Sequence, residues 1–183
     1  MAGVALYSDL KSKLDSSAPV DVRHGLESVK ILPSRGENPF DLYGAITEQA
    51  VALAEIANPS ADRSICMAVT SSQYNTSDGS PTSWSAAVDS ISSGATEENV
   101  KRLFFISAGN VNPEEIKSAE YPDANMLHGI ESPGQSWNAL TVGAYTKSVT
   151  IQDEMYAGFQ AVADNGQLSP YSCLLYTSPS PRD

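Results

Sequence analysis

The sequence has few basic residues and no long apolar run, and each shortage argues against a class of function. Of 183 residues, 11 are lysine or arginine and 22 are aspartate or glutamate, which gives a formal net charge of −11. Nucleic-acid binding depends largely on clustered Lys and Arg, so we expect no nucleic-acid partner. No apolar run approaches the roughly 20 residues of a membrane helix, so no membrane segment is expected here. The first residues also lack the layout of a signal peptide, which leaves the localisation unknown.

Cysteine and histidine are equally scarce. Only Cys66, Cys173, His24 and His128 are present, and their spacing matches no metal-ligand motif, so we expect no metal site. The glycine-rich phosphate loops GxGxxG and GxxxxGK are both absent, and no cofactor can be identified. Both histidines are expected to be surface or structural residues.

What the sequence does contain is an alternation of apolar runs and helical periods. Its 41% hydrophobic residues suffice for one core, so one domain is expected. Buried strands are predicted at 65–69, 103–106 and 139–144, with helices near 43–57 and 84–91. This order predicts a three-layer α/β fold, a parallel sheet with helices on both faces. Ligands of such folds bind beyond the carboxyl ends of the strands.

Several weaker patterns give further expectations. Apolar spacing predicts one helix over 1–14, and alternation predicts a short strand ending at 29–32. Asp41 is a plausible N-cap for the helix at 43–57, whose apolar period runs through Tyr43, Ile46, Ala50, Leu53 and Ala57. Cys66 is expected to be buried within its strand. Asn112 and Pro113 predict the start of a short helix.

The last eleven residues change composition abruptly and show no helical or strand period. Residues 173–183, CLLYTSPSPRD, resemble the in-frame translation of a tagmentation sequencing adaptor, codon for codon. The other interpretation is a Ser/Pro-rich tail. Residues translated from a sequencing adaptor would not be part of the folded domain. We therefore divide the chain into residues 1–172, a partial domain truncated at both ends, and residues 173–183, an adaptor-derived artefact.

A series of short motifs in residues 1–172 resembles the subtilisin-like serine peptidases, or subtilases. Met1-Ala2-Gly3 resembles the end of that family's His-Gly-Thr-x-(Val/Met)-Ala-Gly signature. Residues 29–32, VKIL, are similar to its Val-Lys-Val-Leu strand, and residues 107–110, SAGN, match its Ala-Gly-Asn motif. Residues 140–144, LTVGA, match the Val-Gly-Ala strand that follows, and residues 169–172, SPYS, resemble the turn before the last catalytic segment. Each motif is short, and their common order makes the match specific.

The resemblance implies a subtilisin-like fold, cleavage of peptide or protein substrates, and an acyl-enzyme mechanism in the full-length protein. It assigns Asn110 to the oxyanion hole, where its amide would donate to the tetrahedral intermediate. The family's catalytic Asp, His and Ser motifs are not in this sequence, so the fragment alone is expected to be inactive. The walls of the primary specificity pocket, where substrate would add as an extra strand, are assigned to Val69, Thr70, Ser71, Ser107, Ala108 and Gly109.

Two other interpretations remain open. A catalytically inactive relative could use the same residues only to bind peptides, and the flanking sequence would distinguish it. An unrelated α/β domain could bind a small ligand, although no phosphate loop supports this. The family pattern is also interrupted, at 70–72 and by an insertion over 111–134, and both departures concern substrate preference.

Overall fold

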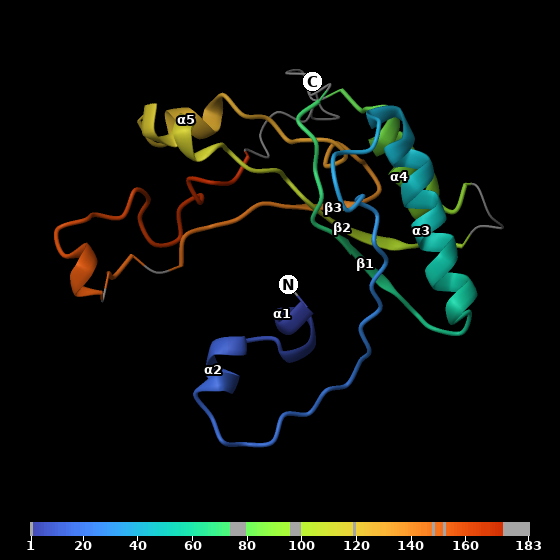
Figure 1. Ribbon diagram of the computed structural model, residues 1–183, viewed down its shortest axis with the longest axis horizontal. Helices are drawn as coiled ribbons and strands as arrows, with labels where there is room; N and C mark the ends of the chain where they lie inside the picture. Colours follow the sequence, from blue (N-terminus) through green and yellow to red (C-terminus); the bar gives the residue numbers. More distant parts are fainter. Residues whose placement is uncertain are drawn as a thin grey trace.

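The protein forms a short parallel sheet with helices, as the sequence predicts. The computed structural model describes residues 2–73, 80–95, 100–118, 120–147, 149–151 and 153–173. Strands β1 (Ser64–Met67), β2 (Leu103–Ser107) and β3 (Leu140–Val142) lie in the order β1-β2-β3 and pair in parallel (Figure 1). The three carboxyl ends therefore meet at one edge. The α/β class predicted from alternating patterns is confirmed.

One face of the sheet carries the main core. Helices α3 (Tyr43–Ala57) and α4 (Ser83–Ser93) pack against each other, and their buried residues form one cluster with β1 and β2. Phe104 and Ile106 alternate with residues that point the other way, because successive side chains of a strand face opposite sides. On that opposite face, three apolar side chains are about half exposed: Leu103 at 44%, Leu140 at 53% and Val142 at 52%. Cys66 is exposed as well, contrary to the expectation of burial.

Local signals explain both ends of α4. Thr82 is its N-cap and forms a capping box with Ser85, which satisfies main-chain N–H groups that have no partner within the helix. Gly94 ends the helix in the left-handed conformation, with φ of 75°. Between these caps, Trp84, Val88 and Ile91 point into the core at helical spacing. The predicted helix and its buried face are confirmed here.

A polar chain of contacts joins α3 to α4 inside the core. The Trp84 ring stacks on Tyr43 with ring centroids 4.5 Å apart. The indole Nε1–H of Trp84 donates to Thr47 Oγ1 at 2.9 Å, and that hydroxyl donates to the carbonyl oxygen of Tyr43 at 2.7 Å. A fully buried Trp N–H needs such a partner, and Thr47 supplies it.

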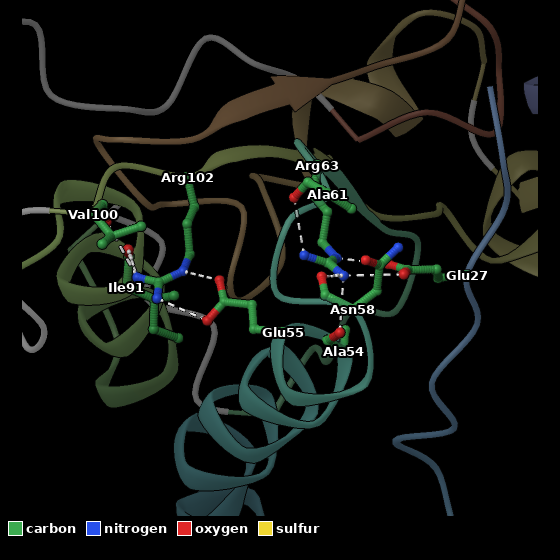
Figure 2. Close-up of polar contacts among 9 residues, drawn as sticks. All are labelled: Glu27, Ala54, Glu55, Asn58, Ala61, Arg63, Ile91, Val100 and Arg102. Atoms are coloured by element: carbon green, nitrogen blue, oxygen red, sulfur yellow. Dashed lines mark hydrogen bonds and ion pairs between the residues drawn. The ribbon is translucent and has the colours of Figure 1, made fainter. Parts of the chain in front are cut away.

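Two arginines tie loops to the end of α3 (Figure 2). Arg102, just before β2, makes a bidentate contact with Glu55 at 2.6 and 3.0 Å. Arg63, just before β1, makes a similar contact with Glu27 and also donates to the carbonyl oxygens of Ala54, Asn58 and Ala61. The contact with Arg102 lowers the pKa of Glu55, and the contact with Arg63 lowers that of Glu27.

The chain before α3 differs from its prediction. Instead of one helix over 1–14, α1 (Ala2–Tyr7) and α2 (Leu10–Leu14) are separated by Ser8, whose φ is +61°, and neither helix buries a residue. The predicted strand at 29–32 is wrong, because the segment pairs with no described strand. Asp41 lies in the 3-10 helix η1 (Phe40–Leu42) and makes no side-chain cap.

The buried face of α3 also differs from the predicted one. Its buried residues are Tyr43, Thr47 and Val51, whereas Leu53 is 52% exposed. The helix bounds agree with the prediction, including the end at Asn58. The remaining short elements are α5 (Pro113–Ser118), α6 (Asp123–Met126) and the 3-10 helix η2 (Glu154–Tyr156). The predicted start of α5 is confirmed, with Asn112 Oδ1 accepting from the main-chain N–H of Glu114.

Candidate functional site

The segments that follow β1 and β2 leave the same edge of the sheet. Residues 69–71 extend β1, and residues 108–110 extend β2, so parallel pairing alone brings both predicted walls to this edge. Val69 packs partly against the core and Ala108 is 1% exposed. Ser107 Oγ accepts the main-chain N–H of Gly109 at 3.2 Å, which closes a tight turn after β2. Among the described residues, no hydrogen bond joins these two segments directly.

A third segment, residues 131–134, joins the two walls. The N–H of Glu131 donates to the carbonyl oxygen of Ala108 at 2.9 Å. The next residue, Ser132, pairs in antiparallel fashion with Ser71: each N–H donates to the other's carbonyl, at 2.8 and 3.2 Å. The hydroxyl of Ser132 also lies 2.6 Å from that of Thr82, at the start of α4. The edge is thus one connected hydrogen-bonded unit.

Two glycines allow this close approach. Gly109 has φ of +110°, a conformation that side chains rarely adopt, and a Cβ there would lie 2.6 Å from Glu131 Cγ. Gly134 is confined for a different reason, since a Cβ there would lie 2.4 Å from Ile130 Cγ2 and 2.9 Å from the carbonyl oxygen of Glu131. Both positions exclude a side chain because backbone and side chain already fill the space.

Asn110 stands at the end of the β2 extension with its side chain exposed. Its neighbours are fixed: the N–H of Val111 donates to the carbonyl of Tyr171, and the N–H of Cys173 to that of Gly109, at 2.9 and 3.4 Å. Among the described residues, no hydrogen-bond partner engages the Asn110 carboxamide. Its two N–H donors therefore remain available at the carboxyl edge of the sheet.

The turn opposite Asn110, residues 169–172, is held by a buried amide. Asn125 Nδ2 lies within hydrogen-bonding distance of three carbonyl oxygens, those of Ser169 (3.2 Å), Pro170 (3.0 Å) and Ser172 (2.8 Å). Asn125 is only 1% exposed, and its Oδ1 is buried without a partner among the described residues. The fixed position of residues 169–172 beside Asn110 depends on this side chain.

The thiol of Cys173, beside this edge, is a poor nucleophile. Burial first, and then the charges of Glu131 and Glu115, raise the pKa of Cys173 to about 12, so its thiol is protonated at neutral pH. His128 Nε2 lies 2.6 Å from Glu115 Oε2, and exposed His24 contacts the carbonyl of Ala5. In the part of the chain that the structure describes, no group of three His, Cys, Asp or Glu could hold a metal ion.

The structure adds one residue to those predicted from sequence. Glu131 lies within the segment 111–134, which departs from the family pattern as an insertion, yet its side chain reaches both Thr70 and Gly109. Thr70 Oγ1 donates to Glu131 Oε2 at 2.5 Å, across 61 positions of sequence. The one signal available beforehand was the Ser-Pro-Gly turn that follows it, and that turn alone does not indicate which strand ends it would meet.

Fold and geometry together define an α/β domain whose predicted site residues lie at the carboxyl ends of parallel strands. The model of the Subtilase family matches residues 1–179, nearly the whole sequence, and the chain belongs to that family. Membership supports a serine peptidase function and a protein substrate in general terms. Searches of curated proteins and of solved structures returned no match. Within the described ranges, no helix is both long and apolar enough to cross a bilayer.

Proposed function

We propose that this chain is the substrate-binding part of a serine-type endopeptidase that works through an acyl-enzyme. Extended peptide would lie along the carboxyl edge, between residues 69–72 and 107–109, with the carbonyl to be cleaved beside Asn110. The observation that carries the proposal is the exposed carboxamide of Asn110, which is held by a fixed backbone and has no hydrogen-bond partner among the described residues. Two N–H donors placed there would stabilise the developing oxyanion.

The main-chain hydrogen bonds of residues 69–72 limit the positions at which a peptide strand could pair with this segment. Ser71 already uses its N–H and carbonyl to pair with Ser132. In the described chain, Ser72 makes no main-chain hydrogen bond, so it is a position from which an added strand could be bound. The side chains of Thr70 and Ser71 would then line the specificity pocket, while the main chain of Ser72 forms the hydrogen bonds with the peptide.

The Asp, His and Ser of the catalytic triad would come from sequence outside this chain, and the chain alone would be inactive. We also retain the proposal that residues 173–183 derive from an adaptor, although the family match extends into them. Recovering the flanking coding sequence from the source sample tests both points. An in-frame His-Gly-Thr before Met1 and a Gly-Thr-Ser after Ser172 are expected; their absence would reject the peptidase.

The completed protein allows a direct test of Asn110. Asn110→Ala is expected to lower kcat by about 10²–10³ with little change in KM, a size known from subtilisin itself rather than derived from this structure. The exposed Asn138 provides a matched control, because Asn138→Ala removes a similar amide away from the edge. Equal activity of the two variants would reject the oxyanion role. Peptide binding by a protein without a triad would instead identify a non-catalytic relative.

A further inference from the structure

Glu131 places a carboxylate between the ends of β1 and β2. Its main chain is bound to Ala108 on one side, and its Oε2 accepts the hydroxyl hydrogen of Thr70 on the other. The side chain also lies against Gly109, where a Cβ would come within 2.7 Å of Oε2. The carboxylate is therefore fixed in position by both predicted walls of the binding edge.

This carboxylate has acceptor capacity that the described protein does not use. Glu131 is half-buried, and its one side-chain hydrogen bond comes from a neutral hydroxyl. Among the described residues, no Lys, Arg or His forms an ion pair with it. An ionised carboxylate has about four lone-pair sites, so several remain open. A half-buried anion without a cationic partner is suited to bind a cation from outside the chain.

We propose that Glu131 selects substrates with Lys or Arg at the residue on the acyl side of the cleaved bond. The inference rests on the proposed function, because it needs that residue to lie between residues 69–71 and 107–109. A charge-assisted hydrogen bond contributes about 1.5–3 kcal/mol, which corresponds to about 10–100-fold in affinity or kcat/KM. An acidic side chain at the same position is disfavoured by repulsion from Glu131.

The decisive comparison is between arginine and citrulline, which have nearly the same shape but differ in charge. The full chain is titrated with the peptide amide Ac-Ala-Ala-Pro-Arg-NH₂ and with its citrulline counterpart, and binding is measured calorimetrically. We expect the arginine peptide to bind about 10–100-fold more tightly. Equal binding of the two peptides overturns the role of Glu131 and leaves peptide binding intact. Binding of neither peptide rejects the binding edge, and the inference with it.

Two variants test whether Glu131 causes the preference for the arginine peptide. Glu131→Gln keeps the shape of the side chain and is expected to remove the difference between the two peptides. Glu154→Gln changes an exposed carboxylate in η2 and is expected to retain the difference. If Glu131→Gln still prefers arginine, another group recognises the cation and the inference is wrong. The comparison of peptides on the unmodified chain holds even if that variant fails to fold.

Discussion

At the scale of single residues, backbone geometry determines which positions of the edge can vary. Gly109 combines a positive φ with contact to Glu131, so two independent effects exclude a side chain. Thr70 has no such constraint on its backbone, and its contribution lies in its hydroxyl. The proposed binding edge thus depends on main-chain shape at residues 107–109 and on side-chain chemistry at Thr70.

Gly109→Ala is expected to destabilise the chain by about 1–3 kcal/mol from backbone strain, with a further cost because Glu131 must move. Pulse proteolysis in urea at low protein concentration measures the change. Gly158 is the matched control: its φ is +97° and no atom lies within 4 Å of its Cβ position, so Gly158→Ala reports strain alone. Equal destabilisation by the two substitutions would show that the contact with Glu131 has no energetic importance.

At the scale of elements, the contact of α3 with α4 depends on a polar group inside an apolar core. Thr47→Val leaves the buried indole N–H of Trp84 without an acceptor, and we expect a loss of about 1–3 kcal/mol in the free energy of unfolding. Thr47→Ser keeps the hydroxyl and should cost about 1 kcal/mol, for the lost methyl group. If Val is tolerated as well as Ser, the hydrogen bond does not stabilise the pair of helices.

The link between α3 and β2 should make stability depend on pH. Arg102 lowers the pKa of Glu55 in the folded chain below its ordinary value of 4.5. The stabilising contribution is therefore fully present above about pH 4.5 and is lost as the pH falls through the lower, folded-state pKa. Urea unfolding between about pH 3 and 7 should show that Glu55→Gln lacks this part of the acid dependence.

A second glutamate on α3 serves as the control for the acid dependence of unfolding. Glu48 is exposed on α3, and Glu48→Gln should keep the acid dependence of the unmodified chain. An unchanged acid dependence in Glu55→Gln would contradict the assignment to the contact with Arg102.

Elements with local signals were predictable from the sequence, and contacts between distant segments were not. The helix α4 carries its period and its Gly94 cap within a short stretch, so both its bounds and its buried face could be predicted. The segment 29–32 has the alternation of a strand, but strand formation also needs a pairing partner, and no described segment provides one. In α3, Leu53 and Ala57 satisfy the helical period, although the buried residues of the helix are Tyr43, Thr47 and Val51.

The same distinction applies to the site. Residues 107–110 could be predicted from a motif at a strand end, as could their place at the carboxyl edge. Glu131 could not, because its approach to Thr70 depends on how a long connection returns to the sheet. Sequence patterns report local conformation and burial, whereas such contacts are set by tertiary packing.

At the scale of the whole molecule, the open face of the sheet should govern behaviour in solution. Leu103, Leu140 and Val142 expose apolar surface that a parallel sheet ordinarily covers, so we expect the chain to self-associate and be poorly soluble. Leu140→Lys should shift the population toward monomer in size-exclusion chromatography with light scattering. Leu53→Lys alters a similarly exposed leucine on α3 and should have little effect. A monomeric, cooperatively melting unmodified chain would contradict this expectation.

The contact of Arg63 with Glu27 ties residues 2–27, here called the N-terminal arm, to the end of α3, and this has a consequence for how the molecule responds to salt. Helices α1 and α2 bury nothing, and the Glu27 side chain is 43% accessible, so this contact is open to screening by ions. Raising the ionic strength should loosen the N-terminal arm while the buried cluster around Trp84 stays intact. The hydrodynamic radius would then increase with salt without loss of tryptophan burial.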